Sequence, residues 1–181
     1  MADRPVITLL TDFGTADAFV GVMKGVILGI APQATLVDLT HEVPPQAVAV
    51  AAFLLETAWR EFPPGTIHLV VVDPGVGSSR RPLAAEGPRA RFVAPDNGVL
   101  SPIFQAGEAT VLHALTRPEF FRQPVSRTFH GRDVFAPVAA HLANGVALAA
   151  LGPPVTDPVR LDLPRPGPLP DGGMADRKSV V

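Results

Sequence analysis

Short aliphatic runs alternate with stretches of helical spacing along the first half of the chain. Residues 6–10 form an apolar run that ends at Asp12, which indicates a strand followed by a turn. From residue 17 to residue 30 the apolar positions recur at steps of three and four, which predicts a helix that Pro32 ends. The same patterns predict three further elements: a strand over 36–39, a helix over 46–62 and a strand over 66–72.

This β-α-β-α-β order is typical of parallel strands joined by right-handed helical crossovers. The three strands are apolar throughout rather than alternating, which predicts a sheet covered on both faces. The second half of the chain is less regular, and it predicts strands over 91–94 and 110–115 and a helix over 133–143. We therefore expect an α/β fold, a three-layer domain with a mostly parallel sheet.

Proline content divides the chain into a domain and a tail. Residues 1–152 carry the predicted elements, and we expect them to form one N-terminal α/β domain. Seven prolines crowd residues 153–170 and two glycines follow, which predicts an interdomain linker over 153–173. Residues 174–177 repeat the Met-Ala-Asp-Arg of residues 1–4, so we expect 174–181 to be a truncated or non-native tail.

Composition narrows the classes of function. The chain has 181 residues, with 15 Lys and Arg against 17 Asp and Glu, and its net charge of −2 gives no electrostatic indication of a nucleic acid or an anionic membrane as partner. No apolar run is long enough to span a bilayer, and we find no secretory signal. The absence of cysteine excludes disulfides, thiolate metal sites and a cysteine nucleophile. We expect a cytoplasmic enzyme domain.

Three carboxylates follow the first three predicted strands, namely Asp12, Asp38 and Asp73. Ligands of open parallel sheets bind beyond the carboxyl ends of the strands. A single acid at such a place is more often a helix cap or a turn residue. Three acids at one edge favour a binding site, without specifying a reaction.

The segment from Asp73 to Arg81 is the first candidate for chemistry. Its two glycines allow the backbone to approach a ligand closely, and two arginines follow. The functional interpretation is a pocket for an anion or a water molecule, in which Asp73 pairs with one arginine. The alternative is a flexible turn with solvated arginines, and the segment alone does not separate the two. It is neither a Walker A loop nor a dinucleotide fingerprint.

The segment around His130 is the second candidate. His130 precedes a glycine and a predicted helix start, where backbone N–H groups favour negative charge or polarised water. We interpret His68, within a strand, and His141, within a helix, as structural, and His41 as intermediate. The chain has no closely spaced metal-ligand motif and no G-x-S-x-G nucleophile motif. The candidates that remain are Asp, Arg and His, and we expect no metal.

Six blocks of sequence, in this order, resemble one known family. These blocks are Thr11-Asp12-Phe13-Gly14, Asp17-x-Phe19-Val20-Gly21-x-Met23-Lys24-Gly25, Asp38-Leu39-Thr40-His41, Val72-Asp73-Pro74-Gly75-Val76-Gly77, Ala94-Pro95-Asp96-Asn97-Gly98 and Thr128-Phe129-His130-Gly131-Arg132-Asp133. Together they resemble the S-adenosyl-L-methionine (SAM) hydroxide adenosyltransferases, or SAM hydrolases, which are related to SAM-dependent chlorinases and fluorinases. The resemblance extends over about residues 5–170.

The resemblance implies that SAM and water react to give adenosine and L-methionine, with attack of activated water on C5′ of the ribose. It implies that Asp73, Arg80 and His130 are the catalytic residues. The family's motif, by its spacing after the residue that matches Asp73, implies Arg80 rather than Arg81. SAM is then the substrate, and no cofactor is expected.

The resemblance also implies a set of substrate-binding residues. Asp12 matches the position that binds the ribose hydroxyls, while Thr128 and Phe129 match the wall of the nucleoside pocket. The remaining members of this set are Phe13, Pro74, Gly75 and Gly131.

Two positions bear on the choice between hydrolase and halogenase. The related halogenases carry Tyr at the position of Asp73, and a carboxylate there would repel a halide. The fluorinase carries a halide-binding Ser at the position of Gly131. Both differences favour water as the nucleophile. The alternatives are a SAM-dependent halogenase (a chlorinase) and a module that binds SAM or adenosine without turnover.

The family resemblance also implies a second, C-terminal domain rich in β-structure. In family trimers that domain completes the site of a neighbouring subunit. We expect the domain to be missing from this chain, the intact protein to be a homotrimer, and the chain alone to have weak activity or none.

Overall fold

A computed structural model describes residues 4–163 of the chain. The predicted tail at 174–181 and the second half of the predicted linker lie outside these residues. The described residues form one six-stranded sheet with the strand order β2-β1-β3-β5-β4-β6. Its strands are β1 (Val6–Thr11), β2 (Thr35–Thr40), β3 (Thr66–Val71), β4 (Pro82–Glu86), β5 (Ala90–Pro95) and β6 (Val111–Ala114).

Most of the sheet is parallel, as the sequence predicted. Strand β1 runs parallel to β2 and β3, and β3 runs parallel to β5. Strand β4 is antiparallel to both of its neighbours, β5 and β6. The β-α-β-α-β unit is therefore confirmed, and β5, β4 and β6 extend the sheet beyond β3.

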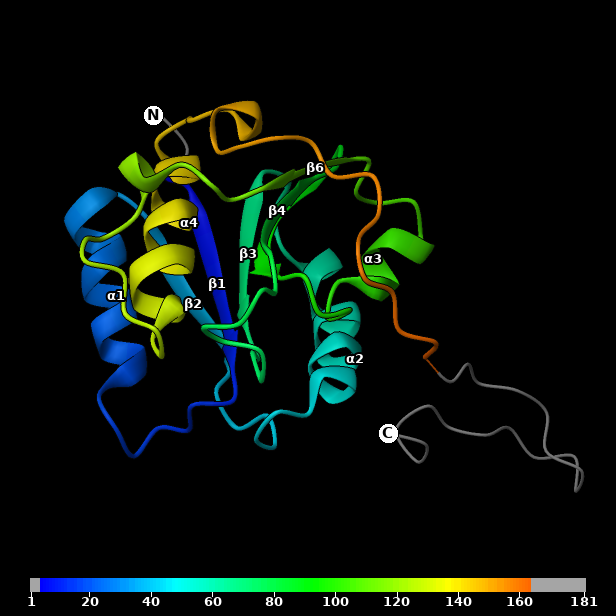
Figure 1. Cartoon of the computed structure of the whole chain (residues 1–181), viewed down its shortest axis with the longest axis horizontal. Coiled ribbons are helices and arrows are strands. Elements are labelled where there is room, and N and C mark those ends of the chain that lie inside the picture. The colour runs from blue at the N-terminus through cyan, green and yellow to red at the C-terminus, as the bar shows by residue number, and fades with distance from the viewer. Residues whose placement is uncertain (1–3, 164–181) are drawn as a thin grey trace, which may run out of the picture.

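Helices cover both faces of the sheet, which confirms the three layers. The α-helices are α1 (Phe19–Ile30), α2 (Val48–Ala58), α3 (Ser101–Gln105) and α4 (Ala136–Ala143). Short helical turns are η1 (Trp59–Glu61), η2 (Pro118–Phe120), η3 (Gly131–Phe135) and η4 (Leu148–Ala150). In Figure 1, α1 and α4 lie on one side of the sheet and α2 and α3 on the other. Two hydrophobic clusters fill the two spaces between helices and sheet.

The structure corrects several boundaries and one prediction of burial. Strand β2 lies at an edge of the sheet and is half-exposed, so it is not covered on both faces. The helix expected over 46–62 is α2 followed by the 3₁₀ turn η1, and the one expected from residue 133 starts at Gly131 with the π-helical turn η3. Strand β4 and helix α3 were not predicted.

The carboxyl ends of the parallel strands meet at the lower edge of the sheet in Figure 1. Thr11 pairs with Val71 at the ends of β1 and β3, so the loops that begin at Asp12 and Val72 leave the sheet side by side. The sequence had predicted this edge as the ligand-binding edge.

Residues 153–163 lie against the domain. Pro154 forms a β-bridge with His113, and the Val155 N–H donates to the Leu112 carbonyl at 2.9 Å. Val155 and Leu163 are buried. The role of 153–173 as a linker between domains stays a prediction. Within residues 4–163, no helix combines the length and apolar character needed to cross a bilayer.

Candidate active site

A cavity of about 400 Å³ opens at the carboxyl edge of the sheet. Loops from β1, β2 and β3 and the segment before η3 contribute its walls. The predicted site residues that line it are Asp12, Phe13, Asp73, Pro74, Thr128, Phe129, His130 and Gly131. Residues far apart in the sequence thus meet in one concave site.

An ion pair between Asp73 and Arg80 lies at this cavity. Arg80 donates from Nε to Oδ1 of Asp73 at 3.0 Å and from Nη2 to Oδ2 at 2.5 Å. The side chain of Asp73 is 5% exposed and that of Arg80 is 7% exposed. The pair is therefore a buried, bidentate fork, the geometry that fixes a carboxylate most firmly. The alternative of a turn with two solvated arginines does not hold for Arg80.

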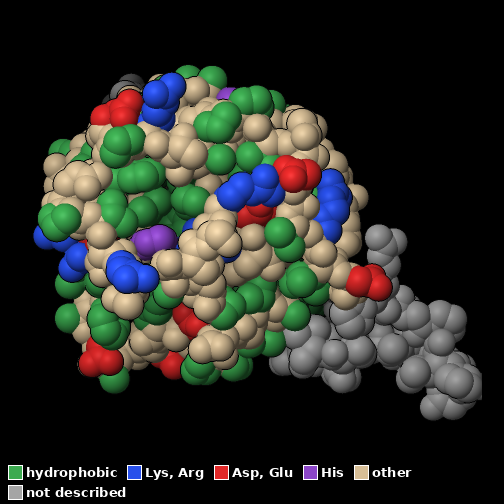
Figure 2. Space-filling model, viewed as in Figure 1, with side chains coloured by type: hydrophobic (Ala, Val, Ile, Leu, Met, Phe, Trp, Pro, Cys, Tyr) green, Lys and Arg blue, Asp and Glu red, His purple; other side chains and the backbone are tan. Residues whose placement is uncertain are grey.

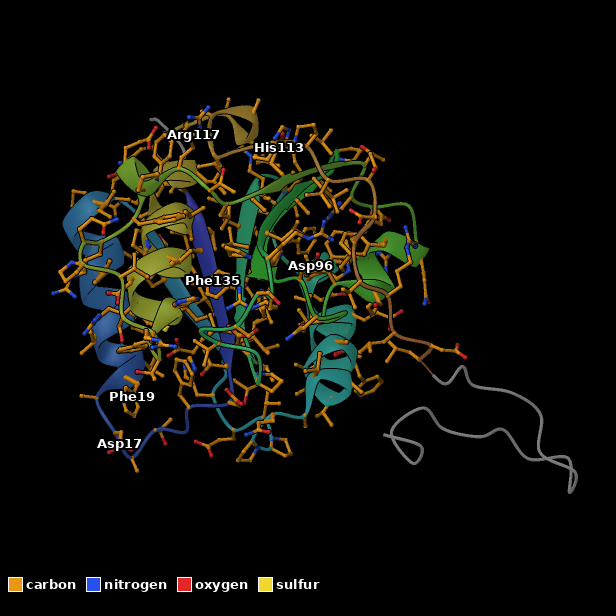
Figure 3. The ribbon with its side chains drawn as sticks, in the orientation of Figure 1. Asp17, Phe19, Asp96, His113, Arg117 and Phe135 are labelled. Carbon is orange, nitrogen blue, oxygen red and sulfur yellow. The ribbon has the colours of Figure 1, made fainter. Side chains whose placement is uncertain are left out.

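His130 completes the cluster. Nη2 of Arg80 lies 3.1 Å from Nδ1 of His130. Arg80 can only donate, so Nδ1 accepts and the proton of a neutral ring is on Nε2. The Arg80 guanidinium also lies over the ring of Phe135, 5.3 Å from its centroid. Figure 3 shows Phe135 near the centre of the domain.

Burial shifts the pKa values of the acid and of the imidazole toward each other. It raises the pKa of the Asp73 carboxyl, against the opposing charges of Arg80 and His130. It lowers the pKa of His130, and the positive charge of Arg80 lowers it further. The raised pKa makes Asp73 a better proton acceptor, and His130 is neutral at neutral pH.

The next arginine, Arg81, lies outside the cavity. It donates from Nε to Oδ2 of Asp96 at 2.9 Å and from Nη1 to Oδ1 of Asp157 at 2.9 Å. In Figure 3 Asp96 lies well away from Phe19, which lines the cavity. On the face shown in Figure 2, some Lys and Arg side chains lie directly beside acidic side chains and others do not. The geometry thus assigns Arg80, not Arg81, to Asp73.

The loop between Asp73 and Arg80 is held in a tight conformation. Ser78 donates its hydroxyl to the Gly75 carbonyl at 2.6 Å and accepts the Arg80 N–H at 3.2 Å. Gly77 has a φ of +75°, and a Cβ there would collide with the carbonyl oxygen of Arg127. The glycine therefore allows this loop to pack against the segment that leads to His130. Gly75 shapes the loop and does not line the cavity.

Asp12 lies across the cavity and is held by Gln46. The Gln46 N–H donates to Oδ2 of Asp12 at 2.8 Å. Within residues 4–163, Gln46 is the one residue other than glycine with a positive φ, 65°. Such a conformation is unfavourable for a side chain and tends to occur at functional sites. Sequence reasoning missed Gln46, although it lies in the loop that follows β2 at the ligand-binding edge.

Three phenylalanines form an aromatic wall at the mouth of the cavity. The rings of Phe13, Phe19 and Phe129 meet edge to face, with centroids 5.3 to 6.0 Å apart. Phe19 is 47% exposed, so part of this aromatic wall faces solvent. The sequence placed Phe19 on the apolar side of its helix and did not identify it as a site residue. Other lining residues that it missed are Pro45, Val71 and Val76.

Asp38, the third acid at this edge, does not line the cavity. Its Oδ2 accepts from Nζ of Lys24 at 2.6 Å, and its Oδ1 lies 3.0 Å from Nε2 of His41. It is therefore an ion-pair residue of β2, and the expectation that all three acids share one site is wrong for Asp38.

A second buried acid, Asp133, pairs with Arg122 and Arg132 and does not line the cavity. His68 is fully buried and bonded to Thr8, in keeping with the structural role expected of it. No three His, Asp or Glu side chains in this range gather as metal ligands would. The arrangement found here can orient a water molecule and accept its proton beside an apolar, aromatic pocket.

Comparison with known proteins identifies relatives of the chain. The family described as "SAM hydroxide adenosyltransferase N-terminal domain" matches residues 7–152. A protein of Salinispora arenicola named (R)-S-adenosyl-L-methionine hydrolase is 44% identical over 184 residues, covering 99% of this chain and 70% of that protein. A protein of the same name from Thermus thermophilus is 44% identical, over 88% of this chain and 66% of its own length. A fluorinase of Nocardia brasiliensis is more distant, at 27% identity over 85% of this chain and 59% of its own length.

Solved structures share the fold. The crystal structure of an uncharacterised conserved protein from Thermotoga maritima superposes with a TM-score of 0.86 at 42% identity, over 88% of this chain. The present chain spans 62% of the length of that protein.

Proposed function

Because the chain belongs to the SAM hydroxide adenosyltransferase family, we propose that it carries the water-activating half of an enzyme that hydrolyses SAM to adenosine and L-methionine. The observation that carries the proposal is the buried fork between Arg80 and Asp73, with His130 on its far side. The carboxylate held in this way faces a pocket of nucleoside size that has an aromatic wall and carries Asp12 as a second acid.

In the proposed reaction a water oxygen attacks C5′ of the ribose opposite the sulfonium. The C5′–O bond forms as the C5′–S bond breaks, and sulfur leaves with the bonding pair as the neutral thioether of methionine. The proton of the water passes to Asp73 and then to solvent. The leaving group needs no protonation, so the work of the protein is to position water and to exclude bulk solvent.

The residues divide this work by their positions. Asp73 orients the water and accepts its proton, aided by the pKa that burial raises. Arg80 fixes both carboxylate oxygens, and neutral His130 accepts a second hydrogen bond from Nη2 of Arg80. Asp12 binds the ribose hydroxyls with the oxygen that Gln46 leaves free, while the aromatic wall packs against the nucleoside.

Water is favoured over halide for two physical reasons. The Asp73 carboxylate would repel an anion at the attacking position. At Gly131 a Cβ would lie 3.2 Å from Sδ of Met23 and 3.3 Å from the ring of Phe13, so a halide-binding hydroxyl there would crowd both neighbours.

The test is to incubate the protein with SAM in H₂¹⁸O, with and without chloride, and to analyse the nucleoside product by mass spectrometry. Because the family resemblance implies a second domain at the site, the assay includes the chain alone and the chain supplied with a C-terminal domain of the family. Adenosine that carries ¹⁸O at C5′ in both buffers is the expected result. A 5′-chloro nucleoside, or methionine release without ¹⁸O in adenosine, contradicts the proposal.

Asp73→Asn separates an enzyme from a binding module. The amide keeps the size of the side chain but cannot accept the proton, so turnover should fall by about 100-fold or more while SAM affinity changes little. Tight SAM binding by a wild-type protein without any cleavage would favour the module. The homotrimer and the cytoplasmic location stay predictions of the sequence.

A further inference from the structure

His41 is a buried residue of the third sequence block that does not line the cavity. Its side chain is 4% exposed. Nδ1 lies 2.9 Å from the hydroxyl of Thr11, and Nε2 lies 3.0 Å from Oδ1 of Asp38. Lys24 binds the other oxygen of Asp38 at 2.6 Å. His41 therefore connects a surface ion pair to the end of β1.

One tautomer fits the contact between His41 and Thr11. With the proton on Nε2, Nδ1 accepts the Thr11 hydroxyl proton, while Nε2 lies 3.0 Å from Oδ1 of Asp38 without an aligned hydrogen bond. The Thr11 oxygen then accepts the Phe13 N–H, which lies at 3.3 Å. The contacts thus run in one direction, from His41 through Thr11 to the loop of the cavity.

These contacts hold the residues on both sides of Asp12. Thr11 precedes it and is bonded to His41, while the N–H of Gly14 donates to the His41 carbonyl at 2.8 Å. Five residues after His41, the Gln46 N–H binds the Asp12 carboxylate. The loop that carries Asp12 is therefore joined to the loop that orients its carboxylate through one residue, His41, by its imidazole and by its main-chain carbonyl.

We propose that His41 is a positioning residue, which fixes the direction of the Asp12 carboxylate through the hydroxyl of Thr11. The inference rests on the proposed function in one respect, because it takes the ribose of the substrate to be the group that Asp12 binds. His41 itself touches no substrate. Asp38, which is paired with Lys24, lies beside the other nitrogen of the imidazole.

The same sheet offers a matched control. Thr8 also lies on β1, is fully buried and bonds Nδ1 of a histidine, His68, at 2.8 Å. That pair lies within the core and has no contact with the Asp12 loop. Thr8→Val and Thr11→Val each remove one buried hydroxyl from one histidine, so they should lower the stability of the domain by similar amounts.

The first measurement is amide hydrogen exchange of the ligand-free chain, followed at Phe13 and Gln46. Thr11→Val should accelerate exchange at both amides by about tenfold, since a supporting hydrogen bond is lost, and Thr8→Val should leave them unchanged. His41→Asn, whose amide oxygen can replace Nδ1, should resemble wild type. His41→Gln, whose amide nitrogen can replace Nε2, should resemble Thr11→Val. Equal exchange rates at Phe13 and Gln46 in Thr11→Val and Thr8→Val would overturn the proposal.

The second measurement compares the affinities for adenosine and 2′,3′-dideoxyadenosine. Thr11→Val should lower the affinity for adenosine by about tenfold, because Asp12 is no longer positioned. The affinity for the dideoxy analogue should not change, because the analogue lacks the hydroxyls that Asp12 binds. A Thr11→Val protein that keeps the wild-type preference for adenosine overturns the inference. A wild-type protein that does not distinguish the two nucleosides overturns the proposed ribose contact instead, and the exchange experiment still decides the role of His41.

Discussion

Arg80 and Arg81 are consecutive in the chain, yet their guanidinium groups bind carboxylates in different parts of the domain. Arg80 forms the buried fork on Asp73, whereas Arg81 binds Asp96 and Asp157, the latter in the segment 153–163 that lies against the domain. The pair thus gives an internal control for the proposed catalytic role, since both positions carry the same side chain.

Arg80→Lys should lower kcat for SAM hydrolysis by about 100-fold. A lysine carries the charge but cannot bind both oxygens of Asp73, so the carboxylate loses its fixed direction. Arg81→Lys should keep kcat within about threefold. Steady-state kinetics with SAM provide the measurement, and equal losses in the two variants would contradict the assignment of Arg80.

Gly131→Ala should raise KM for SAM by roughly tenfold without unfolding the protein. The new methyl group would lie 3.2 Å from Met23 and 3.3 Å from Phe13, so the wall of the cavity must shift by a few tenths of an ångström. Gly25→Ala is the control, because a Cβ there meets nothing within 4 Å and should stabilise α1 by about 0.5–1 kcal/mol. An unchanged KM for Gly131→Ala would show that this wall is not close to the substrate.

The pH dependence of kcat/KM should show an acid limb between the ordinary pKa values of Asp and His. Burial raises the pKa of Asp73 above 3.8 and lowers that of His130 below 6.5, and the proposed active form has Asp73 ionised and His130 neutral. Activity should therefore be constant from pH 8 to about pH 6.5 and fall below it, since protonated His130 would face Arg80. A limb centred above pH 6.5 would be inconsistent with these shifts.

The stability of the domain should rise with pH between 4 and 6.5 because of His68. Burial lowers the pKa of His68 from 6.5 to about 4, so in this interval the unfolded chain binds a proton that the folded chain does not. The contribution of neutral His68 to the free energy of unfolding is fully present above pH 6.5. It is lost progressively toward pH 4, by about 3 kcal/mol in total. His68→Gln should flatten the curve of unfolding free energy against pH. If the wild-type protein and His68→Gln give parallel curves of unfolding free energy against pH, this role of His68 is refuted.

Local patterns alone predicted the first half of the fold. The periodicity of residues 6–72 gave the β-α-β-α-β unit, because a buried strand and an amphipathic helix each impose their own spacing. The carboxyl edge followed from this unit, and with it the nearness of Asp12 and Asp73. Strand β4 was missed because Pro82–Glu86 is short and alanine-rich, and its pairing with β5 and β6 gives it its place in the sheet.

The sequence likewise predicted some features of the site, and the structure was needed for the others. Sequence motifs identified Asp73 and His130, since each follows or precedes a recognisable element. The direction of the side chains decided the rest, because Arg80 points inward to Asp73, while Asp38 points to Lys24 rather than to the cavity. The positive φ of Gln46 and its bond to Asp12 depend on how two distant loops meet. The sequence by itself determined which chemical groups reach the edge of the sheet, because spacing is local, and the tertiary structure decided which of them face one another, because that depends on packing between distant segments.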